Sequence, residues 1–162
     1  MQDISRRKFV KSAMAAAVAT AAADATLQAQ QPANRVSGYD HVALPMRNTD
    51  AMVAFYKKLG FDVREAANAV SVYAGRQMIN FHRPARWQDA AFTLRARAAT
   101  PPCGDLCFVW DGTPAQLKSW LDVSGARVEE GPVARPGGRQ APGASTYIRD
   151  PDGNLLEFMI YA

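Results

Sequence analysis

The sequence predicts an α+β protein in which two βαβββ modules form a curved mixed sheet around a cleft. Three observations predict this fold class: a helix pattern at 51–63 recurs at 115–128, a strand pattern precedes each copy, and three strand patterns follow each copy. The chain has 162 residues and is 48% hydrophobic, which is enough for one globular core. No run of about 18 apolar residues lies outside the N-terminus, so we expect no membrane-spanning helix.

The two helix patterns align with each other residue by residue. Residues 51–63 read AMVAFYKKLGFDV and residues 115–128 read AQLKSWLDVSGARV. A shift of 65 places Met52 on Leu117, Phe55 on Trp120, Tyr56 on Leu121 and Gly60 on Gly125. Apolar residues at i, i+3 and i+4 form one buried helix face, so we expect these aromatic side chains in the core. Each glycine predicts a helix end, and the starts are marked by Asn48–Asp50 and by Thr113–Pro114.

Strand patterns surround both helices. We expect strands before the helices at 39–45 and 105–110, and three after each helix: 61–66, 70–74 and 78–83, then 126–130, 144–149 and 154–161. In a strand, alternate residues share one face. The apolar set that should pack on the helices is Val42, Leu44, Leu106 and Phe108. The opposite set is His41, Ala43, Asp105 and Cys107.

The last strands of the two copies also align, with a larger shift. MINFH at 78–82 falls on LLEFM at 155–159 with a shift of 77, which places Asn80 on Glu157 and His82 on Met159. The larger shift indicates an insertion, and 131–143 (GPVARPGGRQAPG) supplies it. Its glycines and prolines predict a loop without regular structure, either a lid over the cleft or a surface excursion.

The chain divides into four parts. Residues 1–29 read as an export signal, 38–83 as the first module, 84–103 as a proline-bounded linker and 104–162 as the second module. The turn Asp150-Pro151-Asp152-Gly153-Asn154 combines residues that fix a tight turn, so we expect it to align the strand that carries Glu157.

The N-terminus resembles a twin-arginine export signal. Residues 5–11 read SRRKFVK, and an alanine-rich run follows from Ala13 to Ala23. Small residues allow cleavage after Ala25 or Ala29. These features predict a periplasmic protein that begins near Gln30 and has no membrane segment after cleavage. The alternative is an amphipathic N-terminal helix of the fold.

Charge argues against a nucleic-acid partner. The net charge is +4, but residues 1–29 hold four basic and two acidic residues, which leaves 15 against 13 in the rest. No clustered basic face is evident. Four arginines of one segment, Arg83, Arg86, Arg95 and Arg97, form either a solvated loop or an anion-steering patch.

Cysteines are few. Cys103 and Cys107 could form a disulfide in an oxidising compartment if the chain turns at Gly104. In one extended strand they would stand about 13 Å apart, too far for a bridge. A zinc site is less supported, because no second cysteine pair exists.

Four motifs together resemble the vicinal oxygen chelate superfamily. They are YDHVALPMRNTDAMVAFYKKLGFDV, INFH, DLCFVW and RDPDGNLLEFMIY, and they span 38–162. This superfamily includes glyoxalase I, fosfomycin-resistance enzymes, extradiol dioxygenases and bleomycin-binding proteins. DPDGNLLE is the most specific piece, and the sequence is most similar to small glyoxalase-domain proteins.

The resemblance implies a divalent-metal site in the cleft. Family members hold the ion with residues on the first and last strands of both modules, which match His41 and Glu157. Asp105 stands where a second histidine is usual. Asn80 stands where glyoxalase I has a glutamate, and His82 on the same strand face could replace it. The expected ligands are therefore His41, His82, Asp105 and Glu157, for Fe, Mn, Zn or Ni. Some superfamily members bind ligands without a metal.

Two functions follow from the resemblance. The first is a metal-dependent lyase, isomerase or dioxygenase that acts on a small oxygen-bearing substrate, with Glu157 moving a proton. The alternative is a non-catalytic small-molecule binder of the bleomycin-resistance type. A weaker third is an interaction module exported with a partner. Glutathione-dependent glyoxalase I is disfavoured by the altered ligands, and the family favours a homodimer.

Overall fold

The structure, a computed structural model, describes residues 35–162, and the export signal expected at 1–29 lies outside this range. Residues 39–162 form one compact unit. Its first repeat contains β1 (His41–Pro45), α2 (Thr49–Lys58), β2 (Asp62–Glu65), β3 (Ala69–Ala74) and β4 (Gln77–His82). A short helix, α3 (Pro84–Trp87), opens the connection to the second repeat. That repeat contains β5 (Asp105–Val109), α4 (Pro114–Ser124), β6 (Val128–Pro136), β7 (Pro142–Arg149) and β8 (Leu155–Tyr161).

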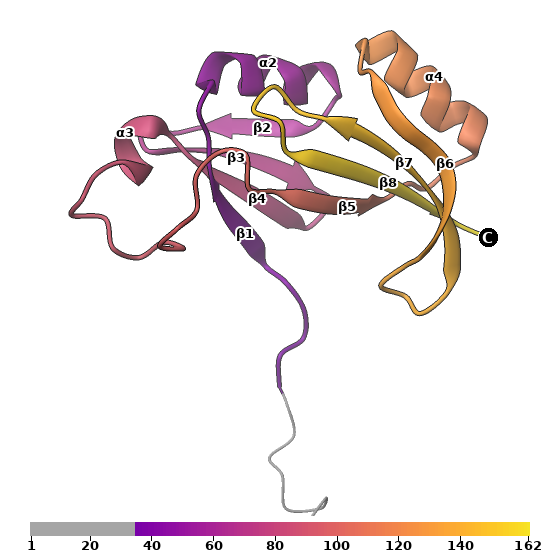
Figure 1. Ribbon diagram of the computed structural model, residues 1–162, viewed down its shortest axis with the longest axis horizontal. Helices are drawn as coiled ribbons and strands as arrows, with labels where there is room; N and C mark the ends of the chain where they lie inside the picture. The colour runs from indigo at the N-terminus through magenta and orange to yellow at the C-terminus, as the bar shows by residue number, and fades with distance from the viewer. Residues whose placement is uncertain (1–34) are drawn as a thin grey trace, which may run out of the picture. The chain divides into compact units, whose positions relative to one another are not determined.

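Each repeat folds into a four-stranded mixed sheet with the same topology. The strand orders are β1-β4-β3-β2 and β5-β8-β7-β6. The first strand of each repeat runs parallel to the last, with His41 opposite Met78 in one sheet and Cys107 opposite Glu157 in the other. Helices α2 and α4 lie on the same side of the two sheets (Figure 1). The predicted fold class, two βαβββ modules, is confirmed.

The helices form where their apolar faces predict, but of the two only α4 has a side-chain cap, because the Asn48 amide at the start of α2 donates to Asp152 instead. Tyr56 and Leu121, which the repeat aligns, are both buried. Helix α4 begins with a capping box. The Thr113 hydroxyl accepts a hydrogen bond from the Gln116 backbone N–H, and the Gln116 side-chain oxygen accepts one from the Thr113 backbone N–H. It ends at Gly125, whose φ of 68° is the left-handed conformation that glycine adopts without strain.

The two repeats share one hydrophobic core. Phe61 of the first repeat packs against Phe108 of the second, with ring centroids 5.5 Å apart. The indole N–H of Trp120 donates to the Leu59 carbonyl oxygen at 3.0 Å. Burial of apolar surface of this kind contributes about 25 cal/mol per Å². The repeats are therefore packed against each other rather than linked only by the chain.

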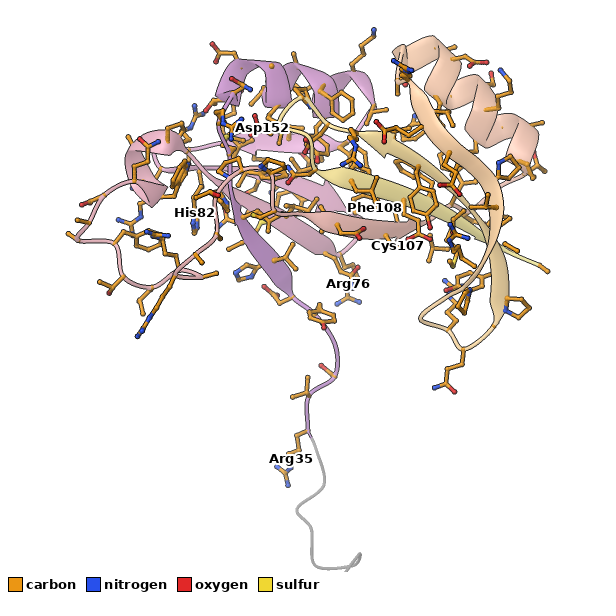
Figure 2. All side chains as sticks on the ribbon, viewed as in Figure 1. Arg35, Arg76, His82, Cys107, Phe108 and Asp152 are labelled. Atoms are coloured by element: carbon orange, nitrogen blue, oxygen red, sulfur yellow. The ribbon has the colours of Figure 1, made fainter. Side chains whose placement is uncertain are left out.

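The turn at 150–154 fastens the second repeat to the first. The two carboxylate oxygens of Asp152 accept hydrogen bonds from the backbone N–H groups of Arg47 at 2.5 Å and Asn48 at 2.9 Å. Asp150 accepts one from the Tyr56 hydroxyl at 3.1 Å. The side-chain oxygen of Asn154 accepts hydrogen bonds from the backbone N–H groups of Cys103 and Gly104. The turn is structural, as its sequence predicts, and it also reaches across to the start of α2, where Asp152 lies in Figure 2.

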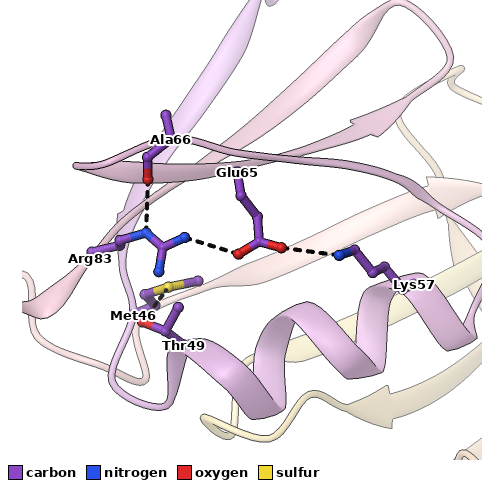
Figure 3. A network of polar contacts seen from close by, with 6 residues as sticks. All are labelled: Met46, Thr49, Lys57, Glu65, Ala66 and Arg83. Atoms are coloured by element: carbon purple, nitrogen blue, oxygen red, sulfur yellow. Dashed lines mark hydrogen bonds and ion pairs between the residues drawn. The ribbon is translucent and has the colours of Figure 1, made fainter.

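A polar network ties α2 to the end of the first sheet (Figure 3). Glu65 accepts from Lys57 and from Arg83, both at 3.0 Å, and Arg83 also donates to the Ala66 carbonyl oxygen at 2.9 Å. These hydrogen bonds, that of Lys57 first, lower the pKa of Glu65 below its usual value. Arg83 thus has a carboxylate partner and is not part of a free basic patch.

The prediction that residues 131–143 form an irregular loop is wrong. Strand β6 continues to Pro136 and β7 starts at Pro142, so the glycine- and proline-rich segment forms most of a β-hairpin. β6 is the edge strand of its sheet, where a proline that lacks an N–H costs no ladder hydrogen bond. Register irregularities between Glu130 and Val133 absorb the Gly131-Pro132 step.

Two further observations concern the cysteines and the length of the helices. Cys103 and Cys107 are both free thiols, so no disulfide joins them. No helix within 35–162 combines the length and the apolar character needed to cross a membrane.

Candidate functional site

Strand parity brings the candidate side chains to one face of the sheets. Their neighbours along the strands, Val42, Ile79, Phe81, Leu106, Leu156 and Phe158, pack in the core under the helices. Because alternate residues point to opposite faces, the candidates lie on the side away from α2 and α4. We call this side the open face. It carries His41, Asn80 and His82 on the first sheet and Asp105, Cys107 and Glu157 on the second.

Glu157 is the most firmly held of these side chains. It lies on β8 and is half-buried, and the hydroxyl of the fully buried Ser145 donates a short hydrogen bond to its Oε1. On its other side, β5 places Cys107 directly opposite. Burial raises the pKa of Cys107 to about 12, and the neighbouring Glu157 carboxylate, to which the thiol hydrogen-bonds, adds to the increase. Ser145 therefore anchors one oxygen of the carboxylate, and Cys107 lies next to it on the neighbouring strand.

Glu157 and Asp105 line a pocket of about 400 Å³ on the open face of the second sheet. Two ion pairs border it: Arg135 with Glu130 at 3.3 Å and Arg149 with Glu129 at 2.9 Å. Each arginine is thus matched by a glutamate. Within residues 35–162, Asp105 and Glu157 form no ion pair, so this pocket holds two carboxylates that no cation neutralises.

Tyr147 completes this pocket. It stands opposite Glu157 in the β7–β8 register, so the two side chains leave the sheet on the same face. Directly opposite residues of an antiparallel pair have Cβ atoms about 4.5–5.5 Å apart. The Tyr147 hydroxyl accepts a hydrogen bond from Arg135 Nε at 3.2 Å, which leaves its proton available to a ligand.

The two histidines lie in separate pockets. His41 bonds the adjacent Asp40 through Nδ1 at 2.7 Å and lines a pocket of about 160 Å³ that also contains Cys107. His82 lines a pocket of about 40 Å³ beneath the connection between the repeats, with its ring centroid 5.1 Å from that of Phe92. Burial, then the charges of Arg86 and His41, lower the pKa of His82. Figure 2 shows His82 well apart from Cys107.

The β1–β4 register explains this separation. His41 stands opposite Met78, whereas His82 stands opposite Pro45, four positions farther along the same pair of strands. At about 3.3 Å per residue, this corresponds to roughly 13 Å. Sequence parity predicts the face of each residue correctly, but it does not say how far apart two residues on that face lie.

The described residues of one chain do not fit a divalent metal. Such an ion needs nitrogen and oxygen ligands about 2.0–2.2 Å away, so the ligand atoms must converge. Between residues 35 and 162, no three His, Cys, Asp or Glu side chains lie close enough to hold one. Of the expected set, the fold brings Asp105 and Glu157 together in one pocket and leaves His41 and His82 in two others.

Sequence reasoning did not single out Ser145 or assign Tyr147 to the site. Ser145 is a polar residue at a fully buried position of β7. Nothing in the sequence shows that its hydroxyl bonds Glu157 on the neighbouring strand β8. The only available signal was the alternation of Ser145 and Tyr147 with the helix-facing Thr146 and Ile148. That signal depends on a strand register that the sequence leaves open.

Comparisons with known proteins support one family. The profile described as glyoxalase/bleomycin resistance protein/dioxygenase superfamily matches residues 38–158. Glyoxalase domain-containing protein RDO1 of Mycosarcoma maydis is 34% identical over 135 residues, which are 83% of this chain and 74% of that protein. Virulence protein STM3117 of Salmonella typhimurium is 36% identical over 126 residues, 75% of this chain and 83% of that one.

Solved structures agree in fold. The crystal structure of STM3117 superposes with a TM-score of 0.68 at 32% identity, covering 82% of this chain and 100% of that one. An integron cassette protein of V. cholerae gives a TM-score of 0.70 at 29% identity, covering 81% of this chain and 100% of that one. With its two βαβββ repeats and the match at 38–158, the chain belongs to the glyoxalase/bleomycin resistance protein/dioxygenase superfamily, which its motifs resemble.

Proposed function

We propose that the protein binds a small oxygen-bearing molecule in the pocket of Glu157, Asp105 and Tyr147 and moves a proton on it. The observation that carries the proposal is the position of Glu157: a half-buried carboxylate, held by Ser145, that opens into about 400 Å³. Taking a carboxylate partly out of water costs free energy, which a ligand or a reaction can recover. The volume is within the range of small-molecule sites.

Glu157 and Tyr147 can act as a pair. The carboxylate of Glu157 can accept a proton from a carbon next to a carbonyl group or from a hydroxyl. The Tyr147 hydroxyl, which already accepts a bond from Arg135, can donate to the oxygen on which negative charge develops. This chemistry belongs to isomerase and lyase reactions. If proton transfer is too slow to observe, the same groups still bind the ligand, as in a non-catalytic binding protein.

A metal-dependent enzyme is the second candidate. The observation that favours it is that His41 on β1 and Asp105 on β5 occupy equivalent positions of the two repeats, both on the open face. One chain does not bring them together with a third ligand. A homodimer in which the open face of one repeat meets that of a second copy would unite His41 with Asp105 and Glu157. A bound divalent ion would supply Lewis-acid polarisation of the substrate oxygens.

Elemental analysis separates these candidates. Protein beginning near Gln30 would be purified without chelator or affinity metal, beside His41→Ala, Glu157→Gln and the control His82→Ala. The first candidate predicts no ion in the wild type, even after incubation with Fe, Mn, Zn or Ni. About one ion per chain, lost with His41→Ala and Glu157→Gln and kept with His82→Ala, would establish the metal site instead. Light scattering on the same samples reports whether a dimer accompanies it.

A ligand screen tests the role of Glu157. Small hydroxyketones, diols and hydroxy acids would be titrated calorimetrically and assayed for exchange of carbon-bound hydrogen with D₂O. For any compound bound, Glu157→Gln should abolish the exchange and weaken binding. The matched control is Asp122→Asn, an exposed carboxylate outside this pocket that pairs with Lys118. If Glu157→Gln binds and exchanges like the wild type, the proposal fails.

We further propose that the protein is exported by the twin-arginine route. The support is the motif at residues 5–11. Fractionation of cells that express the full chain should find it in the periplasm. Replacement of Arg6 and Arg7 by lysine should retain it in the cytoplasm, and unchanged export of that variant would contradict the assignment.

A further inference from the structure

A second pocket, of about 570 Å³, lies along the free edge of β5. That strand pairs with β8 on one side only. Its other side faces the end of α2 and the β3–β4 turn of the first repeat, and the pocket lies in this space. Its walls are aromatic, and the rings come from both repeats: Phe61, Phe108, Trp110, Trp120 and Phe158. We call it the aromatic pocket.

Packing holds these rings in place. Phe108 and Phe158 are stacked, with centroids 5.6 Å apart and planes inclined at 23°. Trp110 and Trp120 lie 5.0 Å apart with an angle of 38°. Trp120 is fixed further by its hydrogen bond to the Leu59 carbonyl oxygen. The rings are fixed but inclined to one another, from 23° between Phe108 and Phe158 to 79° between Trp120 and Phe158, so a ligand can meet both ring faces and ring edges. Such a wall favours an aromatic ligand, because offset-stacked and edge-to-face ring pairs each contribute about 0.5–1.5 kcal/mol beyond area burial.

Part of the lining carries little side-chain bulk. It is formed by the turn between β3 and β4, where Gly75 has a φ of 60° and a side chain added at this position would meet no atom within 4 Å. The neighbouring Gln77 is exposed and supplies amide donors and an acceptor at the rim. The turn therefore adds no side-chain bulk to the pocket at Gly75.

One charge borders the aromatic pocket. Among residues 35–162, Arg139 at the tip of the β6–β7 hairpin is the only ionic side chain of its lining, and the Cys107 thiol of the same lining stays protonated because its pKa is raised to about 12. The guanidinium lies over the Tyr161 ring, 4.9 Å from its centroid, and forms no ion pair with a carboxylate of the part of the chain described. Aromatic walls with one unneutralised cation complement an aromatic anion.

We propose that the aromatic pocket is a second ligand site, specific for a planar aromatic carboxylate whose rings lie against the aromatic wall and whose carboxylate pairs with Arg139. The site is separate from that of Glu157. Cys107 lies between the two, because it lines the aromatic pocket and hydrogen-bonds Glu157. The proposal goes beyond the proposed function and does not depend on it.

The test uses 2-naphthoate as the probe and 2-naphthamide as its neutral counterpart of the same shape. Binding to the full chain would be followed by quenching of tryptophan fluorescence and by calorimetry. We expect saturable binding of naphthoate, weakened roughly five- to tenfold by Arg139→Gln, whereas the weaker binding of naphthamide stays the same. The control is Arg97→Gln, an exposed arginine outside the pocket, which should change neither.

Three results would overturn the proposal. The first is no saturable binding at millimolar naphthoate. The second is an equal effect of Arg139→Gln on the acid and the amide. The third is loss of naphthoate binding in Glu157→Gln but not in Arg139→Gln, which would place the ligand in the other pocket. A failure here leaves the proposed function standing. Conversely, the Glu157→Gln variant can lose the exchange chemistry and still bind naphthoate. That result shows that the Glu157 pocket and the aromatic pocket are independent sites.

Discussion

At the scale of single residues, Cys107 and Glu157 influence each other across the β5–β8 pair. Burial and the neighbouring carboxylate raise the pKa of Cys107 to about 12, so the reactive thiolate is scarce at ordinary pH although the residue is exposed. We predict that Glu157→Gln increases the alkylation rate of Cys107 by iodoacetamide at pH 8.5 severalfold, since removing the carboxylate charge removes one cause of the raised pKa and leaves more thiolate. Peptide mass spectrometry measures the rate.

Cys103 is the internal reference for this experiment. Burial alone raises its pKa, with no contribution from Glu157, so its rate should stay the same in both proteins. In the wild type, the rate at Cys107 should keep rising with pH up to about 12. Equal rates at Cys107 with and without the Glu157 charge would show that burial, not the carboxylate, sets its reactivity.

At the scale of elements, the β6–β7 hairpin depends on one glycine of its turn. A Cβ atom at Gly137 would overlap the Tyr161 hydroxyl and the Met159 sulfur, whereas one at Gly138 would meet nothing within 4 Å. We predict that Gly137→Ala displaces the hairpin tip and costs about 1–2 kcal/mol. The measurements are urea unfolding and the rate of tryptic cleavage after Arg139, which should rise.

Gly138→Ala is the matched control for the hairpin. It has the same chemistry one residue away and should stay within about 0.5 kcal/mol of the wild type, with unchanged cleavage. If the two variants behave alike, the tip is not held against β8 at Tyr161. Arg139, whose backbone N–H donates to the Tyr161 hydroxyl, would then have no fixed position. The proposed affinity for an aromatic acid would lose that support.

This hairpin also shows where the sequence stops being informative. The strand–helix–strand order and the face of His41, Asp105 and Glu157 follow from local periodicity, which is present in both repeats. The extension of β6 does not, because Gly131 and Pro132 are tolerated only when the strand lies at a sheet edge, and sheet order is a tertiary property. The separation of His41 from His82 likewise depends on register, which side-chain alternation does not specify.

At the scale of the whole molecule, the two repeats are joined by apolar packing and by a buried polar turn. The aromatic contacts between Phe61 and Phe108 are not directional enough to set the angle between the sheets. Asp152, 6% exposed, is directional, since it accepts from the backbones of Arg47 and Asn48 and from the Asn48 side-chain amide at 2.9 Å. Asp152 thus connects the turn between β7 and β8 to the start of α2.

We predict that Asp152→Ala destabilises the protein by about 2–4 kcal/mol, because it leaves two backbone N–H groups at the junction of the repeats without acceptors. Urea unfolding of the full chain measures this. The control is Asp122→Ala, which removes an exposed carboxylate paired with Lys118 and should cost at most about 0.5 kcal/mol. A similarly small loss for Asp152→Ala would mean that the shared apolar core alone holds the repeats together. A large loss with a lower m-value would show that the repeats begin to unfold separately once the turn is released.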